Sequence, residues 1–130
     1  MLAAAGRVAA FIETGDWTLP AEAFASSGAV IVENFAPFVF EGPDAVARWA
    51  DGMREHLVGV TALRHAFGPA HDFCDLGDTA YFALPTTWRG EKAGRAWTET
   101  GGWSFVLVRE AGEWRVRAYA WAVTGFEFEG

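Results

Sequence analysis

Two ionisable side chains stand among apolar neighbours in strand-like segments, where they could carry out acid and base chemistry. His65 alternates with Leu63 and Phe67, so its imidazole is expected on the apolar side of a strand. Glu99 alternates with Trp97 in the same way and shares its face with aromatic rings. Rings around a carboxyl group desolvate it and raise its pKa, and an imidazole titrates near neutral pH. His65 and Glu99 are therefore the candidate catalytic pair.

Each member of this pair also has a structural explanation. A half-buried histidine that is held by a backbone partner accounts for the pattern around His65 equally well. Glu99 precedes Gly101 and Gly102, where a β-bulge would invert the alternation and turn the carboxylate toward solvent. Both alternatives stay open from the residues alone.

Other ionisable residues favour structural roles. His56 follows Glu55 at the end of an expected helix, where a positive charge complements the helix dipole. His71 and Asp72 lie close to Cys74, but their spacing matches no metal-ligand pattern. The sequence therefore predicts no metal site, and we expect no cofactor.

Aromatic side chains are frequent in this chain of 130 residues. Its 11 Phe, 7 Trp and 2 Tyr exceed what a core of this size needs, so some rings are expected to line a cavity or a contact surface. Besides the catalytic pair, the expected wall contains Phe11, Trp17, Asn34, Phe38, Trp49, Tyr81, Trp97 and Trp103. Such a wall predicts binding of a small apolar or aromatic molecule.

Composition and charge limit the other possibilities. A hydrophobic content of 52% suits a single domain over residues 1–130. The net charge of −7, with scattered Lys and Arg, argues against nucleic acid as a partner. Cys74 is the only cysteine, which excludes an intrachain disulfide and favours a cytoplasmic protein. No apolar run approaches the length of a membrane span, so a membrane is not an expected partner.

The first half of the chain predicts three helices and two short strands. Apolar residues recur at helical spacing over residues 2–14, and a short helix is expected over residues 20–25. The β-branched run at residues 29–35 predicts a strand, with residues 38–40 as its partner. After Gly42-Pro43-Asp44, the apolar stripe Val46, Trp49, Met53 and Leu57 predicts the clearest helix.

The second half predicts four long strands, at residues 59–72, 78–89, 94–109 and 114–125, separated by turns. The last two are joined by a polar turn, which indicates an antiparallel hairpin. This order predicts an α+β fold in which a cone-shaped, curved, mostly antiparallel sheet wraps around three helices and encloses a pocket.

Three short segments connect this order of elements with a known superfamily. They are Gly15-Asp16-Trp17 after the first helix, Glu41-Gly42-Pro43 before the third, and Gly112-Glu113-Trp114-Arg115-Val116 at the start of the last strand. With them the chain resembles the nuclear-transport-factor-2-like superfamily, of cystatin-like architecture, and within it the SnoaL-like branch. The resemblance implies an α+β cone with a pocket between sheet and helices, and a dimer. It also implies a choice among isomerases, dehydratases, polyketide cyclases and protein-binding modules.

Two mechanisms known in that superfamily lack their residues here. At the positions that match the steroid isomerases, Asn34 replaces the carboxylate base, Val8 replaces the tyrosine donor, and the acid falls near Trp103. The cyclases that resemble SnoaL place an acid on the last strand and a histidine nearby, whereas the strand at residues 114–125 carries neither. The sequence therefore argues against both mechanisms.

The final hairpin also predicts an association surface. If Arg109 pairs with Trp114, regular alternation places Tyr119 and Trp121 on the outer face of the sheet. An apolar outer face favours a homodimer. The alternative to a ligand-binding protein is then a non-catalytic dimerisation or protein-interaction module, in which Trp49, Trp97 and Trp103 would fill the cone.

Overall fold

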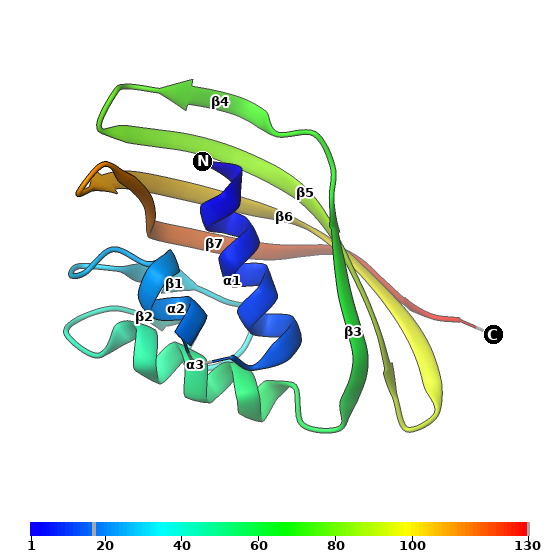
Figure 1. Ribbon diagram of the computed structural model, residues 1–130. Helices are drawn as coiled ribbons and strands as arrows, with labels where there is room; N and C mark the ends of the chain where they lie inside the picture. Colours follow the sequence, from blue (N-terminus) through cyan, green and yellow to red (C-terminus); the bar gives the residue numbers. More distant parts are fainter. Residues whose placement is uncertain (17, 130) are drawn as a thin grey trace.

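The structure is a computed structural model and describes residues 1–16 and 18–129. In this part of the chain, helices lie against the concave side of a curved seven-stranded sheet (Figure 1). The helices are α1 Leu2–Thr14, α2 Thr18–Ala23 and α3 Ala45–His56. The strands are β1 Val30–Val32, β2 Val39–Phe40, β3 Val60–Phe67, β4 His71–Asp75, β5 Thr79–Lys92, β6 Arg95–Glu110 and β7 Glu113–Phe128. The predicted α+β cone is confirmed.

The strand order is β2-β1-β7-β6-β5-β3, and β4 pairs with the other end of β5. All neighbours are antiparallel except β1 and β7. The single strand expected over residues 59–72 is wrong, because the chain leaves the sheet at 68–70 and returns as β4. The amide of Gly68 donates to the carbonyl of Pro85 (2.7 Å) at this break.

The corner after α1 is organised by local hydrogen bonds. Gly15 adopts the left-handed conformation (φ 70°), which closes the helix C-terminus as its position in the sequence predicts. One Asp16 carboxylate oxygen accepts hydrogen bonds from the backbone amide (3.0 Å) and hydroxyl (2.8 Å) of Thr18. These bonds start α2 and direct the chain back toward the sheet.

The hairpin of β6 and β7 begins as expected and then changes its alternation. Arg109 pairs with Trp114, but a β-bulge between Val106 and Leu107 shifts the register on β7 by one residue. Phe105 therefore lies opposite Tyr119, and Trp103 lies opposite Trp121. Their side chains are buried on the concave side, so the expectation that Tyr119 and Trp121 face outward is wrong.

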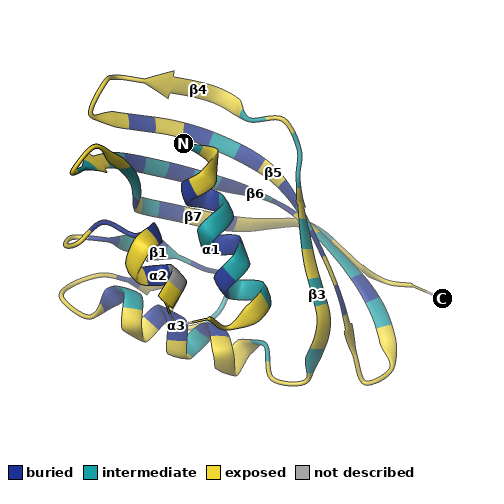
Figure 2. Ribbon diagram, in the orientation of Figure 1, coloured by how far each residue is buried: buried dark blue, intermediate teal, exposed yellow. Residues whose placement is uncertain are grey.

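The core lies where the helices cover the sheet. Each of the two longer helices turns one buried stripe toward the strands, and the middle of β5, β6 and β7 is buried beneath them (Figure 2). Trp49 of α3 and Phe11 of α1 are almost completely buried there, and their rings touch with centroids 5.3 Å apart. The ends of β5, β6 and β7 extend past the helices, which leaves part of the concave face uncovered (Figure 1).

Candidate functional site

A cavity of about 330 Å³ lies on the concave side, between the C-terminal ends of α1 and α3 and the outer ends of the long strands. We call it the tryptophan cavity, because four indole rings line it. Its lining residues are Ile12, Glu33, Asn34, Met53, His56, Leu57, Val60, Leu63, Trp88, Lys92, Trp97, Glu99, Trp103, Trp121, Phe126 and Phe128. The volume lies at the lower end of the range for ligand pockets, about 300–1,000 Å³.

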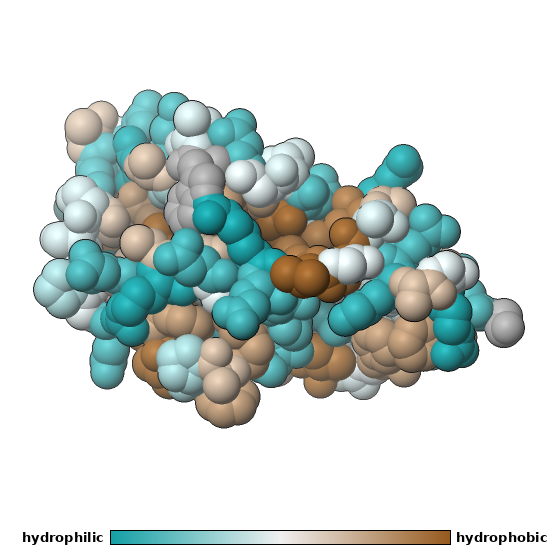
Figure 3. Space-filling model, turned by 90° about the horizontal axis from the view of Figure 1, so that it is seen from below, coloured by the Kyte–Doolittle hydropathy of each residue, from teal (hydrophilic) through white to brown (hydrophobic). Residues whose placement is uncertain are grey.

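Two glycines in the sheet let the indole rings lie flat against the strands. A Cβ atom at Gly90 would lie 2.6 Å from the Trp97 ring, and one at Gly101 would lie 2.5 Å from the Trp121 ring. Any larger residue would therefore push these rings into the cavity. Apolar side chains also gather in the middle of the face seen from below, between hydrophilic stretches (Figure 3).

Glu33 is the deepest ionisable group of the cavity wall. It follows β1 and is 5% exposed. Its Oε2 accepts hydrogen bonds from the Trp49 indole Nε1 (3.0 Å) and from the Tyr119 hydroxyl. Burial raises the pKa of Glu33 to about 7; the two hydrogen bonds oppose this rise, and the nearby charge of Glu99 adds to it. A carboxyl group with such a pKa can take up or release a proton near neutral pH.

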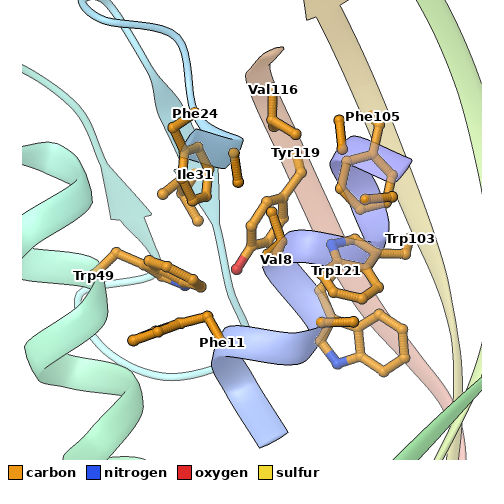
Figure 4. Close-up of a cluster of buried hydrophobic side chains, with 14 of the residues drawn as sticks. Val8, Phe11, Phe24, Ile31, Trp49, Trp103, Phe105, Val116, Tyr119 and Trp121 are labelled. Carbon is orange, nitrogen blue, oxygen red and sulfur yellow. The ribbon is translucent and has the colours of Figure 1, made fainter. Parts of the chain in front are cut away.

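The packing around these groups is aromatic. In Figure 4 the Tyr119 hydroxyl points toward Trp49, and Trp103 and Trp121 lie farther along the same face of the sheet. The Trp103 ring lies edge-on to both Tyr119 and Trp121, with centroid distances of 5.4 and 5.9 Å. Tyr119 is fully enclosed, and desolvation raises its pKa well above the ordinary value, so its hydroxyl stays a hydrogen-bond donor to Glu33.

Glu99 faces the cavity, as the alternation with Trp97 predicts. Burial raises its pKa, and a hydrogen bond from the Trp121 indole partly opposes that rise. A second bulge does occur, between Thr100 and Gly101, but it inserts the extra residue in β7. Glu99 therefore keeps its inward direction.

His65 of β3 is partly buried and contacts Glu13 of α1, but it is not among the residues that line the tryptophan cavity. Its ring packs near Trp88 (5.4 Å) and Phe67 (4.8 Å). A carboxylate oxygen of Glu13 accepts the backbone N–H of His65 (2.7 Å) and contacts Nδ1 of its ring. This contact favours the tautomer with the proton on Nδ1 and leaves Nε2 as the basic atom. The structure thus pairs His65 with Glu13, not with Glu99.

The remaining predicted wall residues divide into three groups. Asn34, Trp97 and Trp103 line the tryptophan cavity. Phe11 and Trp49 belong to the packed core instead, because the helices that carry them press both rings against the sheet. Phe38 is 55% and Tyr81 37% exposed, and neither lines the tryptophan cavity. Trp17 lies outside the described residues.

Several residues that line the tryptophan cavity were not predicted from the sequence. The expected strand at residues 29–35 contains Glu33, but the isomerase pattern falls on the neighbouring residue Asn34 and gives no signal for Glu33. Trp121 was assigned to the wrong face by the unseen bulge. Phe126 and Phe128 lay beyond the expected end of the last strand, although their alternation continues that of the strand and could have extended it.

Among the residues that the structure describes, no group of three or more His, Cys, Asp or Glu side chains could hold a metal ion. The same part of the chain contains no helix of the length and apolarity needed to cross a membrane.

The family model for a SnoaL-like domain matches residues 3–120. The chain belongs to the SnoaL-like family. This assignment agrees with the sheet, the covering helices and the cavity between them. No curated protein matches the sequence.

Solved structures similar to this SnoaL-like chain share its fold at low sequence identity. The Kfla4162 protein from Kribbella flavida has 17% identity and a TM-score of 0.80, covering 97% of this chain and 89% of its own. The hexachlorocyclohexane dehydrochlorinase LinA-type3 from Novosphingobium barchaimii has 8% identity and a TM-score of 0.79, with coverages of 97% and 85%. A nuclear transport factor 2-like superfamily protein from Salmonella enterica has 16% identity and a TM-score of 0.75, with coverages of 94% and 89%.

Proposed function

We propose that this SnoaL-like protein binds a small apolar or aromatic molecule in the tryptophan cavity. The observation that carries the proposal is the lining itself, in which indole rings of β5, β6 and β7 surround an open volume of about 330 Å³. Rings of this kind supply affinity through buried area, and a few polar groups orient the ligand. The similar dehydrochlorinase, as its name states, acts on hexachlorocyclohexane, which is a small apolar compound.

Acid and base chemistry on the bound molecule is the second part of the proposal. Glu33 meets the cavity with a pKa of about 7, so both its protonated and its charged form are populated at neutral pH. Glu99 provides another carboxyl group in the same wall. An isomerase, dehydratase or cyclase reaction would need such a group to carry a proton between two atoms of the substrate.

The pair of His65 and Glu13 is a second candidate for the same chemistry. Glu13 holds Nδ1 of the imidazole, which orients the ring in the way that a carboxylate orients a catalytic histidine. His65 packs against Trp88, whose ring lines the cavity. If a ligand in the cavity displaces the Trp88 ring, which packs against His65, Nε2 of His65 becomes the base that contacts the ligand.

Binding is tested by titrating the protein with 2-naphthol and following the quenching of tryptophan fluorescence. We expect saturable quenching and a rise in melting temperature, because a ligand of the folded state stabilises it. Trp97→Ala should weaken binding, whereas Phe38→Ala, an exposed ring outside the cavity, should not. Equal binding by both variants would contradict the location, and no binding by the wild type to any panel of small aromatic compounds would contradict the function.

The interaction module is the weaker alternative, because an open cavity favours a ligand over a filled cone. A homodimer through the outer sheet face remains a proposal. That face now carries Ser104, Val106 and Val108 of β6 beside Ala118 and Ala120 of β7, a small-residue surface suited to close approach of a second copy. Sedimentation at micromolar concentration tests it.

We also propose a cytoplasmic location, consistent with the exposed free thiol of Cys74.

A further inference from the structure

The tryptophan cavity contains two carboxyl groups, Glu33 and Glu99, that form no ion pair with a basic side chain of the described residues. The hydrogen bonds to Glu33 come from two neutral donors, Trp49 and Tyr119, and both end on Oε2. The two acids also repel each other, since the charge of Glu99 makes ionisation of Glu33 harder.

Basic groups do occur in the lining, but at its exposed rim. Lys92 is the last residue of β5, and His56 is the last residue of α3. Both are exposed, whereas Glu33 is buried and Glu99 is half-buried. Burial and the neighbouring charge of Lys92 lower the pKa of His56, so this imidazole is neutral at pH 8. The interior of the cavity therefore contains the acidic side chains, whereas the basic side chain of Lys92 lies at the exposed rim.

The walls around the carboxyl groups are faces and edges of aromatic rings. The ring faces carry partial negative charge and attract cations, Trp most strongly. One ring of the lining already holds a cation in this way: the Arg95 guanidinium lies over Phe128, 4.2 Å from the ring centroid. Trp97 stacks on Phe126 with centroids 5.7 Å apart, which extends the aromatic wall to the end of β7.

From the rings and the two carboxyl groups together, we propose that the ligand of the tryptophan cavity carries a positive charge on an apolar body, as in an arylalkyl ammonium compound. The proposal rests on the proposed function, because it names the chemical class that the same cavity selects. The ammonium group would lie among the indole rings beside Glu99 and Glu33, and the apolar part would contact Leu57, Val60 and Leu63 near the rim.

Charge and shape can be separated with two probes of nearly equal size. Benzyltrimethylammonium carries a permanent charge that does not depend on pH, and neopentylbenzene replaces its nitrogen by carbon. We expect calorimetry at pH 8 to show about tenfold tighter binding of the ammonium compound, a ratio within the range of desolvated cation and ring contacts. Between pH 8 and pH 5 this preference should shrink, because Glu33, whose pKa is about 7, gains a proton over that range and loses its negative charge.

Variants locate the effect. Glu99→Gln should remove most of the preference for the ammonium compound, measured as the ratio of the dissociation constants of the two probes. Glu22→Gln is the matched control, because it removes the same charge from an exposed position on α2 and should keep the preference. Trp121→Leu should weaken binding of the charged probe more than binding of the neutral one.

The outcomes separate this inference from the proposed function. If the neutral probe binds at pH 8 as tightly as the charged one, or if Glu99→Gln keeps the full preference, the cation proposal is overturned while the cavity remains a ligand site. If neither these probes nor 2-naphthol bind, both proposals fail together. Preferential binding of the ammonium probe that is lost in Glu99→Gln and kept in Glu22→Gln supports both.

Discussion

The two ends of the concave face are built from the same kind of residue but are packed differently. At the end covered by the helices, Trp49, Phe11 and Phe105 are almost completely buried and do not line the tryptophan cavity. At the other end, Trp97 and Trp121 are also buried, yet a cavity lies against them. The packed end receives side chains from α1, α2 and α3, whereas the hollow end is bordered only by the last residues of α1 and α3.

This difference shows that helix coverage, and not aromatic content, decides which rings form the core and which form the wall of a cavity. The long strands continue past the helices (Figure 1), and the rings near their outer ends share the lining of the tryptophan cavity with only a few helix side chains, such as Ile12 and Met53. Glu33 lies at the boundary, with its hydrogen bonds in the packed end and its side chain in the cavity wall.

Removing one ring from each end should give the largest contrast in stability. Trp49→Ala should lower the free energy of unfolding by about 3–5 kcal/mol, because a fully buried ring leaves a cavity and Glu33 loses a donor. Trp97→Ala should cost only about 1–2 kcal/mol, since its ring already borders an open volume. Urea unfolding at pH 7 measures both, and equal losses would show that the two ends are packed alike.

The boundary carboxyl group should make stability depend on pH. The folded-state pKa of Glu33 is about 7, above its ordinary value of 4.5, so the folded state binds more protons between these two values. Stability from this group is therefore complete below about pH 4.5 and is lost as the pH rises through 7. The loss amounts to about 3–4 kcal/mol at most, at about 1.4 kcal/mol per pKa unit over the rise from 4.5 to about 7.

Glu33→Gln should remove that dependence, because an amide keeps the hydrogen bonds from Trp49 and Tyr119 but does not titrate. Unfolding at a series of pH values should show a shallower decline for the variant between pH 5 and pH 8. Glu22→Gln, on the exposed face of α2, serves as the control and should follow the wild type. An unchanged decline in Glu33→Gln would place the titrating group elsewhere.

The sequence predicted the packed end better than the hollow end. The helical stripe that contains Trp49 is a local pattern, and it correctly indicated which face of α3 is buried. The hollow end depends on how far strands continue and where bulges fall, and neither is encoded in alternation alone. Regular alternation from the pair of Arg109 and Trp114 predicted that Tyr119 and Trp121 face outward. The bulge in β7 adds one unpaired residue, Arg117, and therefore turns both side chains inward.

The candidate site was predicted in part for the same reason. Glu99 and Trp97 follow an uninterrupted stretch of β6, and their common inward direction could be read from their spacing. Glu33 acquires its properties from Trp49, Tyr119 and Glu99, which are distant in the sequence and meet it only in the folded chain. No local pattern indicates a pKa that depends on such contacts.

Gly90→Ala tests whether the hollow end depends on close packing of its own wall. The added Cβ would lie 2.6 Å from the Trp97 ring, so the ring must move toward the cavity. We expect a loss of stability of about 2–3 kcal/mol and weaker binding of 2-naphthol. Gly102→Ala is the matched control in the next strand, because its Cβ would have no neighbour within 4 Å. Equal losses of stability and of 2-naphthol binding in the two variants would show that close packing of Trp97 against Gly90 does not shape the cavity wall.

Tyr119→Phe should give the smallest effect, and one whose size depends on pH. The variant loses only the hydroxyl that donates to Glu33, so the cost should be about 1 kcal/mol at pH 5, where Glu33 is protonated, and about 2 kcal/mol at pH 8, where it is charged. Because this hydrogen bond lowers the pKa of Glu33, its removal should move the decline in stability to higher pH. Tyr81→Phe removes the same group from an exposed position and should change neither quantity. A cost that is equal at both pH values would mean that Tyr119 stabilises the packed end without sensing the charge at its boundary.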